Sequence, residues 1–571
     1  MRENLRKKLR CAAVLLLCAA LLIGCAVPAF HTDGRRSVPR FSEMEYSRPD
    51  MSAIEKNINA ALDALENEVT YRALVRLLER CYDDLNAFAT MTELASIRAD
   101  MNMRDAYYAA ESAWCNEQFY SVRQMMEELY CACAKSKYGK RLEENFFWEG
   151  FLEEYGDEAS VTDDACVALL QRESALVARY YALMLDPTIR MDGDEVKLND
   201  YLSYVGSYDY TRALTLFCEQ YNERFADIYA ELVKLRKELA QRLGYDTYEQ
   251  MQFEYFFGRD YTPEQAERYV REIREYIVPL YHEIMSDNPY ARADYYYVDS
   301  DETLEVLCSA VGQMGGAVGE ACDFMLTHEL FDIERRDDKA DRSYQTYITD
   351  YEAPFLFTKP LGDVSDILTA AHEFGHYTDA YVNYNRDESI DLAEVFSQSM
   401  EYLVLDRADK VLSAEQTENL LLIKLLDTLE LYVQQASFYE FEKAVFEADE
   451  DELDAEFLSS LSLRLAEEYG YCTGMNKNYY AYSWLTVVHF FEQPFYVISY
   501  PVSNSVAMQV YELELEESGS GLDKFLALLT LDTGYIIEAA ERAGLESPFD
   551  EGAVSRTADT LMRFAESCGV M

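Results

Sequence analysis

The chain has 571 residues, of which 49% are hydrophobic, and this share of apolar residues excludes a largely disordered protein. Asp and Glu number 105 against 51 Lys and Arg, which gives a formal net charge of −54. Such a chain repels nucleic acid and anionic lipid, so we expect no nucleic acid partner.

The first 25 residues have the pattern of an export signal. A basic stretch over residues 1–10 precedes an apolar run from Cys11 to Ile23 that is too short for a comfortable membrane span. The ending Leu22-Ile23-Gly24-Cys25 resembles the bacterial lipobox, which implies cleavage before Cys25 and lipid attachment to its thiol. An uncleaved anchor and ordinary secretory cleavage nearby remain alternatives. Each version makes the rest of the chain extracytoplasmic, and the lipobox version anchors it to a bacterial membrane.

The order of segments follows from this start. We expect a signal peptide over residues 1–24 and a flexible tether over residues 25–50, which contain Pro, Ser, Arg and Asp. Ten cysteines lie beyond the signal, without a C-x-x-C motif, and we expect them to be mostly buried thiols. The sequence does not indicate an oligomeric state.

Most of the chain after residue 50 has apolar residues at helical spacing, and Gly and Pro are sparse. The pattern predicts a mainly α protein with a small β-sheet just before residue 363. A polar, turn-like stretch near Met191–Asp200 suggests a boundary between an N-terminal helical region, 51–190, and a second part, 191–571. The longest predicted helices are Ala53–Leu85, Asp105–Ala134, Ala213–Arg242, Pro263–Met285 with a kink at Pro279, and Thr417–Ala448.

The sequence His372-Glu373-Phe374-Gly375-His376 is an H-E-x-x-H motif within a predicted helix, for which Asp363 and Ser365 offer N-cap oxygens. His372 and His376 are four residues apart, so they share one helix face and one zinc ion can bind both. The neighbouring Glu373 can polarise a metal-bound water. A packed and hydrogen-bonded His pair is the alternative, but the chain has only six His.

A catalytic zinc needs a third protein ligand and one open position. Glu394 lies 22 residues after His372 in a second amphipathic helix, beyond a predicted turn over Tyr381–Glu388. A hairpin of the two helices would bring Glu394 to the metal. Glu401 lies two turns further along nearly the same face and could hydrogen-bond a ligating His, although a solvated helix face explains it nearly as well.

This combination resembles the thimet oligopeptidase and oligoendopeptidase F family of zinc peptidases. The resemblance rests on H-E-F-G-H followed by E-V-F-S-Q-S-M-E-Y-L, and on the upstream runs 342–347 and 353–358. It extends over roughly residues 190 to 565 and to a late segment with His489, Tyr496 and Tyr500. Two positions depart from the family: Asp379 stands where relatives often carry another His, and Pro501-Val502-Ser503 replaces small residues.

The resemblance implies a role for each residue. His372, His376 and Glu394 would hold one Zn²⁺, and Glu373 would act as the general base. His489 and either Tyr496 or Tyr500 would donate hydrogen bonds to the oxyanion, although the chain has 46 Tyr and a lining role is the alternative. The family further implies a deep substrate cleft, and a strand over Ala353–Thr358 as the edge along which the peptide extends.

The expected function is therefore hydrolysis of short peptides by a zinc endopeptidase outside the cytoplasm, attached to the membrane through lipidated Cys25. The first alternative is a catalytically inactive peptide-binding lipoprotein with a retained metal site. A metal-dependent hydrolase for another substrate is a third option, which the late Tyr segment disfavours.

Overall fold

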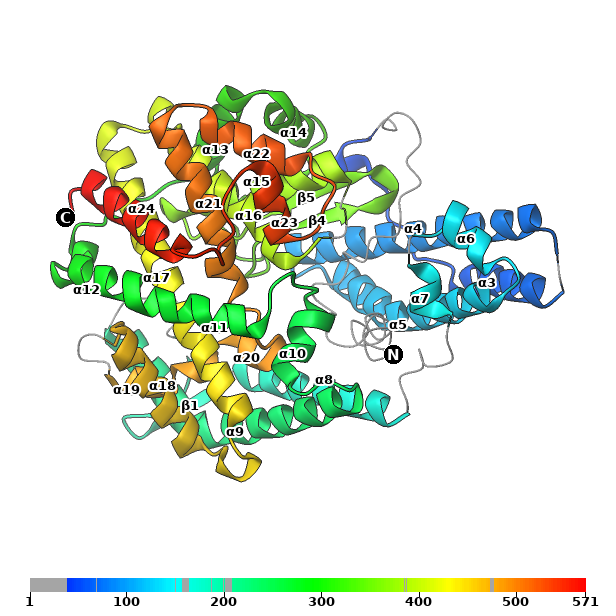
Figure 1. Ribbon diagram of the computed structural model, residues 1–571, viewed down its shortest axis with the longest axis horizontal. Coiled ribbons are helices and arrows are strands. Elements are labelled where there is room, and N and C mark those ends of the chain that lie inside the picture. The colour runs from blue at the N-terminus through cyan, green and yellow to red at the C-terminus, as the bar shows by residue number, and fades with distance from the viewer. Residues whose placement is uncertain are drawn as a thin grey trace. The chain divides into compact units, whose positions relative to one another are not determined.

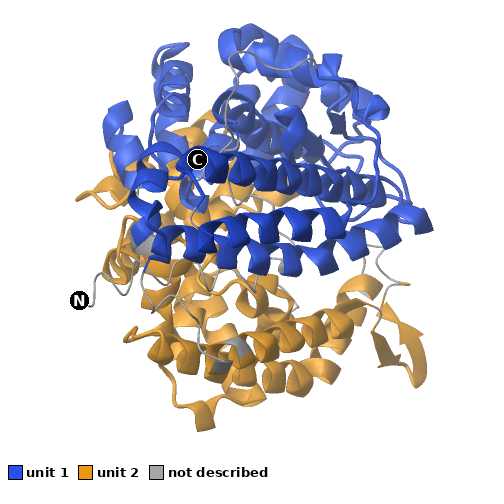
Figure 2. Cartoon of the chain, turned by 90° about the vertical axis from the view of Figure 1, so that its right-hand side faces the viewer, with its two compact units in different colours: residues 1–161, 293–424, 506–545 blue, residues 162–292, 425–505, 546–571 orange. Residues whose placement is uncertain are grey.

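The computed structural model describes residues 38–67, 69–148, 150–156, 164–185, 187–198, 200, 208–384, 386, 388–472 and 477–571. The chain folds into two compact units, which are interleaved along the sequence (Figure 2). Unit 1 comprises 1–161, 293–424 and 506–545, and unit 2 comprises 162–292, 425–505 and 546–571. This arrangement differs from the predicted linear boundary between 190 and 191, because each unit is assembled from three separate stretches of chain.

The first part of unit 1 is a bundle of helices that pack side by side, drawn in blue and cyan in Figure 1. Its core is apolar and includes Leu74, Leu78, Phe88 and Leu129. One long helix was expected over Ala53–Leu85, but the structure has two, because the hydroxyl of Thr70 caps a new helix by accepting from the Ala73 amide. The helices are α3 (Met51–Glu66), α4 (Tyr71–Met101), α5 (Ala106–Lys135), α6 (Gly139–Asn145) and α7 (Phe151–Tyr155).

Residues 38–50 belong to the expected tether, yet they are packed against the rest of unit 1. Phe41 and Met44 are buried, and the Phe41 amide donates to the His328 carbonyl at 2.8 Å. Tyr46 donates to the Glu111 carboxylate at 2.7 Å. The described part of this segment is therefore ordered by burial of its apolar side chains. The predicted signal peptide lies outside the described residues.

Unit 1 also contains the small predicted sheet, whose strands are β3 (Phe331–Asp332), β4 (Tyr344–Ile348) and β5 (Ala353–Phe357). The strand order is β3-β5-β4, with β3 parallel and β4 antiparallel to β5. The expectation that residues 353–358 form an edge strand is wrong, because β5 lies between β4 and the short β3, which pairs with Leu356 and Phe357, and β5 is entirely buried. A sheet edge in this unit is offered by β4.

Helices cover this sheet and complete unit 1. The helix with the H-E-x-x-H motif packs on both β4 and β5. The helices are α13 (Ser300–Met314), α14 (Gly316–Thr327), α15 (Ser365–Asn383), α16 (Ile390–Leu405), α22 (Ser520–Leu529) and α23 (Ile536–Ala543). α17 (Ala414–Glu447) and α21 (Ser499–Glu516) contribute residues to both units.

The described residues of unit 2 are helical apart from one hairpin and the connecting loops, and the hairpin is formed by β1 (Thr188–Met191) and β2 (Asp194–Lys197). The turn-like residues that suggested a domain boundary are the hairpin turn, where Asp192 and Gly193 have positive φ. The helices are α8 (Asp164–Leu185), α9 (Tyr208–Arg242), α10 (Tyr248–Met251), α11 (Pro263–Glu272), α12 (Val278–Ser286), α18 (Ala455–Tyr469), α19 (Lys477–Tyr482), α20 (Val488–Glu492) and α24 (Ala553–Ser567).

The kink expected at Pro279 is a π-helical turn over Ile273–Ile277, which separates α11 from α12. Proline has no amide hydrogen and its ring clashes with the preceding turn, so a straight α-helix does not continue through it. Within the described residues, no helix is both long and apolar enough to cross a membrane.

Candidate metal centre

α15 and α16 form an antiparallel pair with very close backbones. A Cβ on Gly375 would lie 2.4 Å from the Phe396 carbonyl oxygen and 2.5 Å from the Ser397 Cα. Only glycine permits this approach, since real Cβ contacts are longer. The second variable position of the H-E-x-x-H motif thereby brings α16 against α15 and sets which side chains of α16 face the two histidines.

The start of α15 is stabilised where the sequence predicted a cap, but mainly by another residue. Asp363 Oδ1 accepts from the Ser365 amide at 2.9 Å. The buried carboxylate of Asp366 accepts from the Leu361 and Gly362 amides at 2.8 and 2.7 Å. These bonds give the backbone amides at the start of α15 hydrogen-bond partners. The carboxylates also place negative charge near the helix N-terminus, where the helix dipole favours it.

The predicted ligands meet at the centre of this helix pair. One ligand atom each from His372, His376 and Glu394 can be chosen so that all lie within 4.8 Å of one another. His372 Nε2 is 3.5 Å from Glu394 Oε2, and Ser397 donates to the same oxygen at 3.0 Å. Two imidazoles and one carboxylate converging in this way match the ligand set of a catalytic zinc site.

Glu401 orients the first histidine. Its Oε1 lies 2.9 Å from His372 Nδ1, and because a carboxylate only accepts, Nδ1 carries the proton. When the ring is neutral, Nε2 carries its lone pair on the side of Glu394. This is the carboxylate–histidine arrangement that supports ligation in metal sites, so the hypothesis of a supporting role for Glu401 fits better than a solvated helix face.

Lys424 is a residue that the sequence reading missed. It lies on α17, is 4% exposed, and donates to Glu401 Oε2 at 2.7 Å. The signal was a single charge within the apolar run Leu420-Leu421-Leu422-Ile423-Lys424-Leu425-Leu426, since a buried lysine needs a partner. The line His372–Glu401–Lys424 thus links a ligand to a buried cation.

Burial and this charge pattern set the ionisation of the side chains at this site. Burial acts against the charged form of His372, but the Glu401 hydrogen bond and neighbouring carboxylates raise its pKa to about 9. Burial and the charge of His372 lower the pKa of His376 to about 3. Burial raises the pKa of Glu373 to about 7, in the range suited to a general base near neutral pH. Burial opposes ionisation of Glu401, but Lys424 and His372 lower its pKa to about 2.

Asp379, which departs from the family pattern, has a structural partner. Arg386 Nη2 lies 3.1 Å from Asp379 Oδ1, and Arg386 Nε lies 2.8 Å from Glu388 Oε2. Asn383 also donates to Asp379, at 2.7 Å. Burial, and then the charge of Asp379, raises the pKa of Glu388 well above its ordinary value. This cluster ties the end of α15 to the residues that precede α16.

His489, Tyr496 and Tyr500 form a second group, within unit 2. The rings of His489 and Tyr496 stack with centroids 4.7 Å apart and planes 10° apart. Tyr500 Oη lies 3.3 Å from His489 Nε2. Burial lowers the pKa of His489 to about 4, so this imidazole is neutral near pH 7. The seven predicted site residues are therefore assembled as two groups, one in each unit.

Comparisons with known sequences identify one family in two parts of the chain. Residues 41–152 match the Peptidase M3 N-terminal domain, and residues 317–530 match Peptidase family M3. An oligoendopeptidase F homolog of Lactococcus lactis subsp. lactis (strain IL1403) is 25% identical over 364 residues, which cover 59% of each chain. The plasmid oligoendopeptidase F of Lactococcus lactis subsp. cremoris is 24% identical over the same length and shares. The chain thus aligns with less than two thirds of these curated relatives.

Solved structures share the fold over most of the chain. An X-ray structure assigned as oligoendopeptidase F superimposes with a TM-score of 0.76 at 24% identity, covering 92% of this chain and 99% of the other. PZ peptidase A, solved with an inhibitor, gives a TM-score of 0.74 at 23% identity, with the same coverage. These likenesses agree with the mainly α architecture.

Proposed function

Because residues 41–152 and 317–530 match models of peptidase family M3, we propose that the chain is a zinc-dependent endopeptidase that cleaves short peptides outside the cytoplasm. The observation that carries this proposal is the convergence of His372, His376 and Glu394 beside Glu373. The hydrogen bond from His372 to Glu401 supports it, because a histidine that is merely packed does not need a carboxylate to fix its tautomer.

His372, His376 and Glu394 would hold the zinc, which supplies Lewis acidity and lowers the pKa of a bound water. Glu373 accepts the proton of the attacking water on its carboxylate and passes it to the leaving amine. The raised pKa of Glu373 suits both steps, since the group can take and release a proton near neutral pH.

The oxyanion of the tetrahedral intermediate requires a further hydrogen-bond donor. We assign this role to the group of His489, Tyr496 and Tyr500. Neutral His489 retains one N–H donor, and each tyrosine carries a phenolic O–H that donates a hydrogen bond while the side chain stays neutral. The family resemblance supports this assignment, and the choice between Tyr496 and Tyr500 belongs to experiment.

The test is the variant Glu373→Gln, with Glu415→Gln as the control at a surface glutamate. We expect Glu373→Gln to bind one zinc per chain and to cleave a peptide library at least about 100-fold more slowly, because the base is lost and the ligands remain. Full activity of a zinc-loaded Glu373→Gln would contradict the mechanism.

The same experiment separates the alternatives. An inactive peptide-binding lipoprotein would retain peptides without cutting them, in the wild type as well as in the variant. A metal-dependent hydrolase of another substrate class would leave the peptide library intact and bind none of it. The complete set of ligands and base favours the endopeptidase.

The extracytoplasmic location rests on the pattern of residues 1–25. We propose that Cys25 becomes the lipidated first residue of a membrane-anchored protein. Cys25→Ser should move the protein from the membrane fraction to the soluble fraction, whereas Cys18→Ser should not. Membrane association of Cys25→Ser without a lipid would contradict the lipoprotein assignment.

A further inference from the structure

The segment that carries the second group of residues contains a strained backbone. Phe495 is not glycine, yet its φ is +65°. Bulky side chains rarely adopt this left-handed conformation, and it persists only where the surroundings hold it in place. Phe495 directly precedes Tyr496, so its conformation decides where the tyrosine ring points.

Two buried ionisable side chains, Glu442 and Arg259, bond the two peptide groups that flank Phe495. Glu442 Oε2 accepts from the Phe495 amide at 2.9 Å. Arg259 Nη2 donates to the Phe495 carbonyl at 2.9 Å and to Ser499 Oγ at 2.7 Å. Ser499 is the first residue of α21, and Tyr500 follows it. Glu442 and Arg259 together bond the backbone of Phe495, beside Tyr496, and Arg259 also bonds the hydroxyl of Ser499, beside Tyr500.

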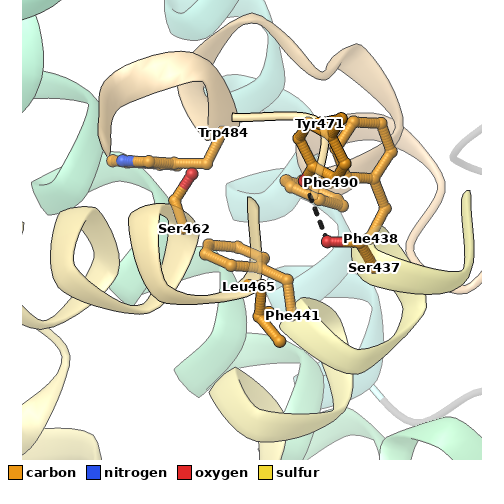
Figure 3. Close-up of a pocket in the computed structure, with 8 residues that line it drawn as sticks. All are labelled: Ser437, Phe438, Phe441, Ser462, Leu465, Tyr471, Trp484 and Phe490. Carbon is orange, nitrogen blue, oxygen red and sulfur yellow. Dashed lines mark hydrogen bonds between the residues drawn. The ribbon is translucent and has the colours of Figure 1, made fainter. Parts of the chain in front are cut away.

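A second arginine holds the other end of the segment. Arg236 is fully buried and donates to the carbonyls of Phe490 and Phe491, at 3.0 and 2.5 Å. Its Nε also donates to Glu173 at 2.6 Å. The side chain of Phe490, the residue after His489, packs on Phe441 and lines a small, mostly aromatic pocket (Figure 3). The backbone beside His489 is therefore held by charge and by packing.

The positions of these charged groups are themselves constrained. Arg259 lies between the rings of Phe253 and Phe257, at 4.4 Å from each centroid. The other oxygen of Glu442, Oε1, is buried and has no hydrogen-bond partner among the described residues. Burying a carboxylate with one oxygen unsatisfied is unfavourable, so the bond to the Phe495 amide has to offset that cost.

We propose that Arg236, Arg259 and Glu442 are positioning residues for catalysis, which hold the backbone of residues 490–499 so that His489, Tyr496 and Tyr500 are placed to donate to the oxyanion. The inference rests on the proposed function of these three residues. These three residues, which we call the frame, bond backbone atoms of the segment and the Ser499 hydroxyl. The frame therefore acts through the geometry of the donors and has no need to contact the substrate.

The test compares two variants of one residue. Glu442→Gln keeps an oxygen that accepts from the Phe495 amide, whereas Glu442→Leu keeps the approximate volume and removes the acceptor. Glu442→Leu should lower kcat about 10- to 100-fold, since a displacement near 1 Å costs about that much, with KM and zinc content unchanged. Glu442→Gln should stay within about threefold of the wild type.

The matched control is Glu430→Leu, a partly buried glutamate on the same helix, α17, that bonds Gln434 instead of the segment. Its kcat should equal that of the wild type. Arg259→Met and Arg259→Lys form a second pair, in which the Met variant should have the lower kcat. They decide the question if Glu442→Leu does not fold, as judged by its thermal transition. Equal kcat for the Leu and Gln variants, or for the Met and Lys variants, would overturn the inference.

A double-mutant cycle separates positioning from general destabilisation. In a background of Tyr496→Phe with Tyr500→Phe, adding Glu442→Leu should reduce kcat by less than about twofold, because the donors it positions are gone. If it reduces kcat as much as in the wild type, the frame acts elsewhere and the inference fails. If the tyrosine background itself retains wild-type kcat, the proposed oxyanion role is wrong and the inference falls with it.

Discussion

At the scale of single residues, the proposed metal centre depends on groups other than the predicted ligands. Glu401 accepts from His372 and from Lys424, and both partners are placed within 3 Å of its oxygens. Burying the charges of Glu401 and Lys424 is favourable only if each charge has a partner. Removing one of these partners should therefore weaken zinc binding through His372.

Lys424→Met tests this dependence. The variant removes the cation that stabilises ionised Glu401, so the hydrogen bond that orients His372 weakens. We expect the zinc dissociation constant to rise about 10- to 100-fold, the range for losing such a supporting partner. Competition with a chromophoric chelator measures it.

Lys410→Met is the control, because Lys410 is an exposed lysine that pairs only locally with Asp409. Its zinc affinity should match that of the wild type. An unchanged zinc affinity in correctly folded Lys424→Met would show that Lys424 serves stability alone.

At the scale of elements, the α15–α16 pair is the part of the protein that the sequence predicts best. The H-E-x-x-H motif indicates the candidate ligands, and the spacing of apolar residues predicts the two helices that carry them. Local sequence is therefore sufficient to predict this pair. The edge strand was predicted wrongly, because the partners of β5 lie in β3 and β4 and pairing between strands is not local. Lys424 and Glu442 were missed for the same reason: their partners are distant in the chain.

The close approach of the two helices makes Gly375 irreplaceable. Gly375→Ala puts a methyl group against the backbone of Phe396 and Ser397, which has no rotamer with which to yield. We expect the free energy of unfolding to fall by at least about 1–3 kcal/mol, and zinc affinity to fall with it. Chemical denaturation with and without zinc measures both.

Gly312→Ala provides the matched comparison, because Gly312 also lies within a helix, α13, and a Cβ there meets no atom within 4 Å. Alanine is the better helix former, so this variant should gain up to about 1 kcal/mol. Equal effects of the two substitutions would contradict the packing argument.

The contact of α4 with the sheet makes the stability of the folded state depend on pH. Burial raises the pKa of Glu93 to about 8, and Thr346 donates to its carboxylate at 2.7 Å. A carboxyl with a raised folded-state pKa favours the folded state at low pH, and this contribution is lost as pH rises from about 4.5 to about 8.

Glu93→Gln should remove this dependence, because the amide stays neutral and its oxygen still accepts from Thr346. We expect the melting temperature of the variant relative to the wild type to increase between pH 5 and pH 8. Melting curves at both values decide it, and a constant difference would contradict burial of an ionisable Glu93.

At the scale of the whole molecule, the predicted site residues are divided between the two units. The predicted metal ligands belong to unit 1, and His489, Tyr496 and Tyr500 belong to unit 2. Periodicity and turn signals predict the mainly α class. They do not predict that each unit is assembled from three separate stretches of chain, because this assembly depends on contacts between residues that are distant in the sequence. The polar stretch near residue 191 was read as a boundary and is a hairpin turn.

The central claim is that one zinc, held by His372, His376 and Glu394, is required for peptide cleavage. The most direct measurement is peptidase activity during stepwise return of zinc to chelator-treated protein. We predict no activity without metal, a linear rise, and a plateau at one zinc per chain, with Glu394→Ala failing to recover at that ratio. Cleavage that persists in metal-free protein, or a plateau unrelated to one zinc per chain, would contradict the claim.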